Sequence, residues 1–234
     1  MSPSLPRGAA WALAALLAAL PGASPLAQGF LDQGVLVITR DGAEIGREEY
    51  AIRPTAGHPG LLAVATDEYR DREARVALEL SDDHVPVTYQ VDVSVAGRVV
   101  ERLSGQLGRG RFAVRLANQQ GETVREFPVP GGIAVLDDDG FDQYVFLPRP
   151  TTGASLPVSL LVPRATRIVA ASIRGVGPDS VHIGSREVPA LHYTLTLPGG
   201  ETREFWCSPA GDLLQVAIPS RTIVATRVAL PPHH

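Results

Sequence analysis

The chain has 234 residues and a formal net charge of −4, and all 21 of its basic residues are arginine. This acidic balance argues against a general nucleic-acid or anionic-membrane surface, because both require an excess of basic residues. Cys207 is the single cysteine, so the chain forms no disulfide within itself and must rely on apolar burial and sheet hydrogen bonds.

The first residues have the layout of a secretory signal. Arg7 supplies a positive charge, residues 9–20 form an apolar run rich in Ala and Leu, and small residues follow up to Ala27. We predict a signal peptide over residues 1–27, with cleavage after Ala27 and with Ser24 as the second choice of site. A retained signal-anchor is the alternative, although the apolar run is shorter than the roughly 20 residues of a membrane span.

Export would place residues 28–234 in the periplasm, with secretion as the alternative. Twenty arginines and all 25 acidic residues follow the cleavage point, so the mature charge is −5. The cleavage region holds no cysteine, which argues against a lipid-anchored lipoprotein. We expect no transmembrane span after cleavage, and the length favours a single all-β domain over 28–234.

Two patterns identify the chain as mainly β. Asp41-Gly42 separates two strand-like runs, and this dipeptide is a strong hairpin signal because both residues tolerate positive φ. In residues 87–95 apolar side chains alternate with polar ones, which is the period of a strand with one buried face. Further strand-like runs, separated by Gly, Pro or Asp, lie at 61–66, 73–80, 99–107, 111–116, 123–129, 156–162, 166–175, 181–183, 188–197, 202–208, 213–218 and 222–230.

This spacing predicts a single curled antiparallel meander of about eleven or more strands, forming a barrel or half-barrel. A sheet of so many twisted strands curls, so we expect its first and last strands to meet. The alternation indicates one covered face and one wet face. It leaves open whether the covered face is filled with side chains or holds a ligand.

One short helical insertion is predicted at about 133–148, between the two halves of the meander. The three aspartates at 137–139 would load its start with negative charge, which suits a helix N-terminus. Phe141, Tyr144 and Val145 would then line one side of the helix. We expect this interruption to be the place where function resides.

No catalytic or metal-binding constellation emerges from the sequence. The aspartates at 137–139 are contiguous, whereas a calcium loop needs acidic residues at alternate positions. His182 and His192 could be neighbours across a tight turn, but zinc would need a third ligand such as Cys207, and ordinary strand histidines are the simpler interpretation. We therefore predict no cofactor, no metal site and no enzymatic activity.

The aromatic residues supply the candidate ligand-binding set: Phe141, Tyr144, Phe146 and Trp206. The first three fall in the predicted insertion, where they could cover the mouth of an apolar cavity. Trp206 alternates with polar neighbours, so we expect it on the more polar face of its strand, where a ligand or partner could meet it. Simple core packing is the alternative for all four side chains.

Several segments together resemble a known architecture. They are the early hairpin at 34–50, the strand-turn-strand "GGETREFWCSPAGDLLQVAIP" at 199–219 and the final strand "TIVATRVAL" at 222–230. This arrangement of strands and turns resembles that of uncharacterised bacterial periplasmic families whose fold is similar to the half-open barrel of the lipoprotein carriers LolA and LolB. The resemblance implies a strongly curved sheet closed by helical lids over an apolar hollow. The chain departs from it in showing one short helix where the carriers have several.

The sequence supports two functional hypotheses. The first is an exported binding or carrier protein that shelters a lipid or acyl chain inside the curved sheet. The second is an envelope structural or protein-interaction module with a filled barrel, whose exposed edge or Trp206 face binds another protein.

Overall fold

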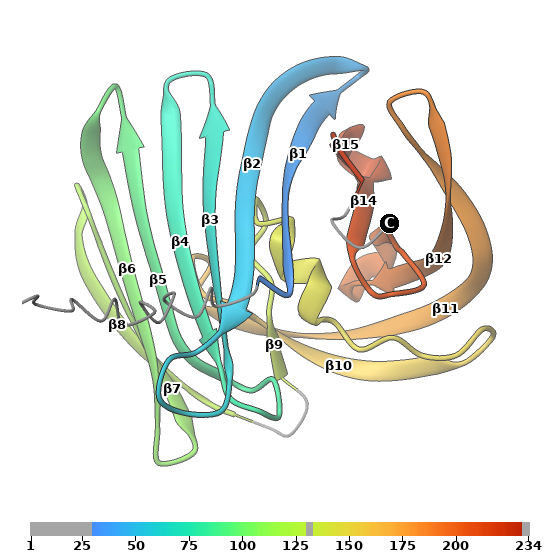
Figure 1. Ribbon diagram of the computed structural model, residues 1–234. Coiled ribbons are helices and arrows are strands. Elements are labelled where there is room, and N and C mark those ends of the chain that lie inside the picture. The colour runs from blue at the N-terminus through green and yellow to red at the C-terminus, as the bar shows by residue number, and fades with distance from the viewer. Residues whose placement is uncertain (1–29, 130–132, 231–234) are drawn as a thin grey trace, which may run out of the picture.

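A computed structural model describes residues 30–129 and 133–230 (Figure 1). The predicted signal peptide, 1–27, lies outside the described residues. Within them the regular structure consists of β-strands and three short 3-10 turns, η1 to η3. None of the helical segments in the described ranges is long and apolar enough to cross a membrane.

The strands form one continuous sheet. In chain order they are β1 (Asp32–Arg40), β2 (Ala43–Pro54), β3 (Leu61–Tyr69), β4 (Arg72–Leu80), β5 (Pro86–Val95), β6 (Arg98–Gly108), β7 (Arg111–Asn118), β8 (Gly121–Pro128), β9 (Ile133–Val135), β10 (Ser155–Val162), β11 (Arg167–Ile183), β12 (Arg186–Thr196), β13 (Thr202–Cys207), β14 (Leu213–Ile218) and β15 (Ile223–Arg227). The 3-10 turns are η1 (Asp142–Phe146), η2 (Pro198–Gly200) and η3 (Pro219–Arg221). This confirms a mainly β fold.

The first and last strands pair, as the curling of a long meander predicts. β1 runs antiparallel to β15, with Ile38 opposite Ala225. Strands that follow one another in the chain also pair with each other, except β8 and β9. The order is β8 to β1, then β15 down to β9, so the two edges of the sheet come from the middle of the chain. The sheet therefore curls around the pairing of the two terminal strands (Figure 1).

The two edges do not pair with each other in the described part of the chain, so the sheet is curled without being closed. β9 joins β10 in parallel over three residues and lies against β5, on the inner side of the sheet. The edge at β9 is thus tucked inside, while β8 lies at the outside. This parallel edge departs from the predicted antiparallel meander.

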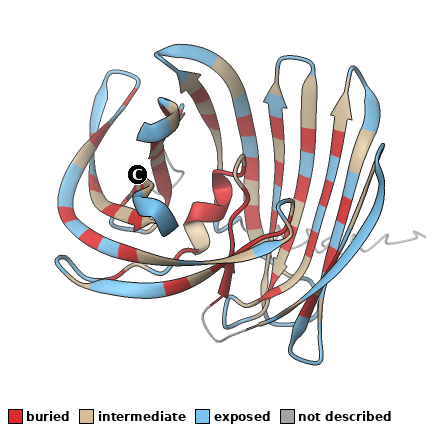
Figure 2. Cartoon of the chain, turned by 180° about the vertical axis from the view of Figure 1, so that it is seen from behind, coloured by how far each residue is buried: buried red, intermediate tan, exposed pale blue. Residues whose placement is uncertain are grey.

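The predicted alternation sets the inner and outer faces of the wall. On β5, Tyr89, Val91 and Val93 are buried, whereas Gln90 and Asp92 between them are exposed. Buried residues alternate with intermediate and exposed ones along most of the strands (Figure 2). Most of the apolar surface that stabilises the fold is therefore buried on this concave side.

The predicted helical insertion at 133–148 is mostly wrong. Its first residues form β9, the aspartates at 137–139 lie in an irregular turn, and only η1 is helical, as a five-residue 3-10 turn. The buried side chains of this stretch hydrogen-bond to the wall, which holds the backbone away from an α-helix. Gly140 also disfavours a helix, because glycine loses more backbone entropy there than other residues.

A glycine on β11 lets the chain after the insertion pack on the sheet. The pairing of β11 with β12 shifts between Gly175 and Gly177, and Thr152 bridges to Gly175. A Cβ at Gly175 would lie 2.6 Å from the carbonyl oxygens of Pro150 and Thr151. Only glycine permits this close approach, which fixes the exit of the insertion against the wall.

Candidate ligand-binding site

The stretch after β9 runs through the interior of the curled sheet instead of covering it. A loop, the η1 turn and an extended portion follow one another inside the wall, and η1 is buried (Figure 2). The Leu136 N–H donates to the Leu161 carbonyl at 3.0 Å, which continues the pairing with β10. We call residues 136–150 the inner segment.

A buried hydrogen-bond network ties the start of the inner segment to β5. The Tyr89 hydroxyl donates to Asp137 Oδ2 at 2.7 Å, and the side-chain amide of Gln143 donates to the Tyr89 oxygen at 3.1 Å. Gln143 Oε1 accepts the backbone N–H of Asp137 at 2.7 Å. Burial raises the pKa of Asp137 to about 6, although the hydrogen bond from Tyr89 favours its charged form.

Glu48 on β2, which is completely buried, anchors the η1 turn. Its two carboxyl oxygens accept the backbone N–H groups of Phe141 at 2.7 Å and of Asp142 at 2.5 Å. The first N–H groups of a helical turn lack partners within the turn. A carboxyl group on the wall supplies those partners and holds the turn in place.

Two more buried carboxyl groups, Asp67 and Asp142, lie close enough to Glu48 to influence its charge. Burial raises the pKa of Glu48 well above its usual range, that of Asp67 to about 8 and that of Asp142 to about 7. Asp67 Oδ1 and Asp142 Oδ1 have no hydrogen-bond partner in the described part of the chain. This cluster can therefore hold protons near neutral pH.

No group of three or more His, Cys, Asp or Glu among residues 30–129 and 133–230 is arranged to hold a metal ion. The acidic turn at 137–139 instead pairs with arginines from the wall. Arg203 Nη2 lies 2.7 Å from Asp138 Oδ1, and Arg164 Nη1 lies 3.3 Å from Asp139 Oδ2. Two of the three aspartates that suggested a helix start, Asp138 and Asp139, are thus ion-pair partners that hold the inner segment.

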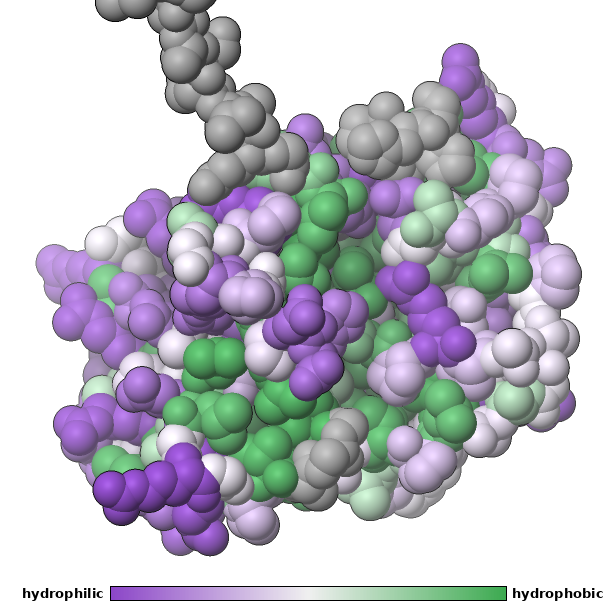
Figure 3. All heavy atoms as spheres, turned by 60° about the horizontal axis from the view of Figure 1, so that its bottom comes forward, coloured by the Kyte–Doolittle hydropathy of each residue, from purple (hydrophilic) through white to green (hydrophobic). Residues whose placement is uncertain are grey.

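At the other end of the inner segment the interior is open. A cavity of about 660 Å³ lies between the start of β1, the adjoining ends of β2 and β3, the turn after β4, β9, the end of the inner segment and the turn between β13 and β14. Its apolar lining includes Leu31, Ile52, Leu61, Ile133, Phe146 and Leu147. Apolar side chains gather around a hollow at this end of the molecule (Figure 3). We call this space the mouth cavity.

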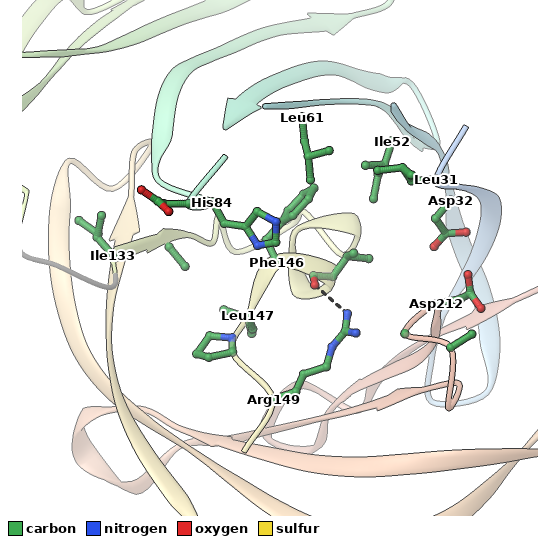
Figure 4. Close-up of a pocket in the computed structure, with 16 residues that line it drawn as sticks. Leu31, Asp32, Ile52, Leu61, His84, Ile133, Phe146, Leu147, Arg149 and Asp212 are labelled. Carbon is green, nitrogen blue, oxygen red and sulfur yellow. Dashed lines mark hydrogen bonds between the residues drawn. The ribbon is translucent and has the colours of Figure 1, made fainter. Parts of the chain in front are cut away.

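Polar groups occupy part of the lining of the mouth cavity. Arg149 extends into it, and the Arg149 Nη2–H donates to the Val145 carbonyl at 2.8 Å (Figure 4). Asp32 lies at the opposite side, where Arg227 Nη1 is 2.9 Å from its Oδ1. Asp212 accepts the Ser208 hydroxyl at 2.7 Å. The cavity therefore combines an apolar wall with a few fixed polar groups, as ligand pockets commonly do.

The structure brings only one of the four predicted ligand-binding residues to the mouth cavity. Phe146 lines it, with the His84 ring 6.4 Å away. Phe141 and Tyr144 are 2% and 1% exposed and pack in the core, where the Tyr144 ring lies 5.6 Å from Phe205. Phe141 directly precedes the short η1 turn and Tyr144 lies within it, and both side chains are buried in the core instead of at the cavity.

Trp206 lies away from the cavity, on the outer face of β13, as the alternation predicts. Its indole stacks on His192, with ring centroids 4.4 Å apart, and its Nε1–H donates to Asp179 Oδ2 at 2.8 Å. The neighbours on the other face, Phe205 and Cys207, are fully buried. Trp206 is therefore part of an ordered surface cluster and not of the mouth cavity.

The candidate histidine pair is not a pair. His182 lies opposite Glu187 in the register of β11 and β12, while His192 lies opposite Gly177. Cys207 is opposite Leu191, and burial raises the pKa of its thiol to about 11. The thiol is therefore protonated at neutral pH and a poor ligand or nucleophile.

Several cavity residues escaped the sequence reasoning. Leu31, Ile52 and Leu61 read as ordinary strand or strand-flanking residues, because the pattern shows the buried face but not which end of it is open. Arg149 stands between two prolines in a predicted loop. That Pro-Arg-Pro stretch is a signal for extended chain, but nothing in it shows that the arginine points inward.

Fold and site together define a curled, barrel-like β protein with an inner segment and an apolar cavity at one end. No protein-family model matches the chain, and no curated protein matches it. Among solved structures it is similar to the crystal structure of a β-barrel-like protein of the domain of unknown function DUF1849 from Brucella abortus. The TM-score is 0.55 at 12% sequence identity, and the match covers 84% of this chain and 95% of that chain.

At that identity the likeness shows the fold alone. It supports the barrel-like architecture that the sequence predicts. The finer resemblance to the lipoprotein carriers LolA and LolB stays a prediction.

Proposed function

We propose that this protein is an exported, periplasmic binding protein that shelters an apolar ligand, such as a lipid or acyl chain, in the mouth cavity. The observation that carries the proposal is the apolar cavity of about 660 Å³ at the open end of the curled sheet. Its size lies within the range of about 300–1,000 Å³ that is usual for small-molecule sites.

Because side chains fill the rest of the interior, the ligand can bind only at the mouth. Phe141, Tyr144 and the network around Tyr89 occupy the space that a hollow barrel would leave free. A ligand would therefore lie at the mouth, against Phe146 and Leu61, and not along the whole concave face. In this respect the proposal differs from a carrier of the LolA or LolB kind, in which lids cover a large hollow.

We propose binding and not catalysis as the role, with no cofactor. The buried Cys207 thiol has a raised pKa, which supports this choice, because a nucleophilic cysteine needs a lowered one. The carboxyl cluster at Glu48 is closed off by the backbone of the η1 turn. Neither group meets the mouth cavity.

Binding can be measured with the neutral fluorescent probe 1-N-phenylnaphthylamine, which brightens in apolar surroundings. Leu31→Glu places a charge on the cavity lining, and we expect the Kd for the probe to rise by about tenfold or more, because the charge must stay hydrated. Leu156→Glu is the matched control: Leu156 is similarly exposed (43% against 51%) but lies outside the cavity. Equal affinity of both variants and the wild type would contradict the proposal.

The export step has its own test. Mass spectrometry of the protein from the periplasmic fraction should give a chain that begins at Gln28. A chain that retains residues 1–27 and stays in the membrane fraction would favour a signal-anchor over cleavage.

The exposed edge of the sheet favours the second function, an envelope protein-interaction module. β8 is the outer edge strand, and six of its eight residues in a row, from Gly121 to Glu126, are exposed. An edge strand offers unpaired backbone groups to a partner strand. In-cell cross-linking should then trap one defined partner, lost in Val124→Pro but retained in Trp206→Ala if β8 is the contact. Loss with Trp206→Ala alone would place the contact at the Trp206 cluster.

A further inference from the structure

Arg149 is the arginine among the described residues that line the mouth cavity. Leu31, Ile52 and Leu61 form an apolar part of its lining, and Arg149 enters from the end of the inner segment with its guanidinium among the lining residues (Figure 4). An arginine inside an apolar cavity costs free energy unless its donors find acceptors. The contacts of Arg149 therefore indicate what the cavity is suited to hold.

Two contacts hold the guanidinium of Arg149 in place. Its Nη2–H donates to the Val145 carbonyl at 2.8 Å, four residues earlier in the chain. Its Nη1 lies against Gly211, where an added Cβ would be only 2.6 Å away. Gly211 also has a φ of +104°, which side-chain-bearing residues rarely adopt. The turn between β13 and β14 is thus shaped to accommodate this arginine.

One donor of the Arg149 guanidinium, the Nε–H group, has no hydrogen-bond acceptor among the described residues. The Nε atom is buried. Among the described residues that line the mouth cavity, Arg149 alone has a buried side-chain nitrogen or oxygen atom without a hydrogen-bond partner. Buried donors in proteins are rarely left unpaired, so a ligand acceptor that meets the guanidinium after a small shift of the Arg149 side chain would supply the missing partner.

The lining holds three aspartates, of which Asp83 is exposed and the other two, Asp32 and Asp212, already have donors. Asp32 accepts from Arg227 at 2.9 Å and from the Tyr50 hydroxyl at 3.0 Å. Asp212 accepts the Ser208 hydroxyl at 2.7 Å. Asp32 and Asp212 are thus engaged by side chains of the wall, so an anionic group on a ligand would give Arg149 a partner that these two carboxylates do not supply.

We infer that the mouth cavity takes a single-chain amphiphile with an anionic oxygen head, of the fatty-acid class. Its carboxylate binds the Arg149 guanidinium and its chain lies along Leu31, Ile52 and Leu61. This inference rests on the proposed function and adds the chemical class of the ligand. Charge-assisted hydrogen bonds between guanidinium and carboxylate are stronger than neutral ones, so the head group decides the preference.

Three probes of equal chain length test the inference: dodecanoate, dodecanol and dodecyltrimethylammonium. Each displaces 1-N-phenylnaphthylamine from the full mature protein at pH 8, below its micelle concentration. We expect the wild type to bind dodecanoate roughly ten- to hundredfold more tightly than dodecanol, and the cationic probe most weakly. This comparison needs no variant, so it stands even if a substitution impairs folding.

Arg149→Gln then assigns the preference to one side chain. Dodecanoate should fall to the affinity of dodecanol, while dodecanol itself changes less than threefold. Arg149→Lys should keep part of the preference, because it retains the charge but loses the planar fork. Arg186→Gln, at an exposed position on β12 outside the cavity, is the matched control and should keep the wild-type order.

The outcomes separate this inference from the proposed function. Equal binding of dodecanoate and dodecanol to the wild type overturns the anionic head and leaves an apolar binding protein. A preference that persists in Arg149→Gln overturns the role of Arg149. Displacement by none of the three probes, together with no binding of the neutral fluorophore, overturns the proposed function itself.

Discussion

The two ends of the inner segment differ in what surrounds them. Near η1 it is fastened by buried polar groups, with Glu48 bound to two backbone N–H groups and Tyr89 bound to Asp137. At Phe146 and beyond, it faces the apolar mouth cavity. At the first end buried hydrogen bonds hold the backbone, and the second end has apolar surface at the cavity and an unpaired arginine donor.

This difference teaches how one short segment can both fill a barrel and build a site. Buried hydrogen bonds at one end fix its position, and only a few residues separate Gln143 from Phe146 and Arg149. A lining held so closely to a rigid anchor loses little conformational entropy when a ligand binds. The polar end would thus preorganise the apolar end.

The largest effect should come from removing Glu48, whose carboxyl group holds the η1 turn at the polar end of the inner segment. Glu48→Ala leaves the buried N–H groups of Phe141 and Asp142 without acceptors and creates a cavity, so we expect a loss of about 3–5 kcal/mol in the free energy of unfolding. Urea unfolding followed by circular dichroism measures it. Glu49→Ala, on the exposed face of the same strand, should change stability by less than about 0.5 kcal/mol. Equal effects of the two substitutions would refute the anchor.

Protonation tests the same end without a substitution. The pKa values of Asp137, Asp142 and Asp67 are raised to about 6, 7 and 8, above the value near 4 of an unfolded chain. The folded protein therefore keeps protons that the unfolded chain has released. Their stabilisation is full below about pH 4 and is lost as the pH rises through 6 to 8.

We expect the free energy of unfolding to fall by several kcal/mol between pH 5 and pH 9, because each pH unit over which only the folded chain keeps a proton costs about 1.4 kcal/mol. Urea midpoints at intervals of one pH unit measure the slope. Asp67→Asn, which keeps the shape but binds no proton, should flatten it above pH 7. A stability that is constant or rises with pH would show that the carboxyl cluster does not hold these protons.

The regular part of this fold could be predicted because each strand shows its own pattern. Alternation in residues 87–95 and the Asp41-Gly42 turn depend only on neighbouring residues, and both appear in the structure as β5 and the β1–β2 hairpin. The pairing of β1 with β15 also follows, from the tendency of long twisted sheets to curl.

The inner segment could not be predicted because its conformation depends on distant partners. Asp137 meets Tyr89, and Phe141 meets Glu48, at separations of 48 and 93 residues. The three aspartates read locally as a helix start, and nothing near them in the chain reveals the arginines that pair with them. Arg149 was missed for the same reason, since its orientation depends on Gly211.

A smaller effect should come from the second polar anchor. Tyr89→Phe removes the hydroxyl that links Asp137 to Gln143 and leaves a buried acceptor with one donor fewer. We expect a loss of about 1–2 kcal/mol in the free energy of unfolding and a weaker hydrogen-exchange protection of residues 136–143. Protection unchanged in that stretch but lowered throughout the sheet would show that Tyr89 supports the wall and not the inner segment.

The smallest expected effects are on probe affinity, and they test which aromatic residues belong to the mouth cavity. Phe146→Ala removes an apolar contact from the cavity lining, so we expect the Kd for 1-N-phenylnaphthylamine to rise roughly tenfold. Trp206→Ala should leave that Kd within about twofold, because the indole stacks on His192 on the outer face and touches no part of the cavity lining. The sequence groups the two aromatics in one ligand-binding set, whereas the structure separates them. A Trp206→Ala variant that binds the probe as weakly as Phe146→Ala would place the ligand on the outer face and reverse the comparison between the two ends of the inner segment.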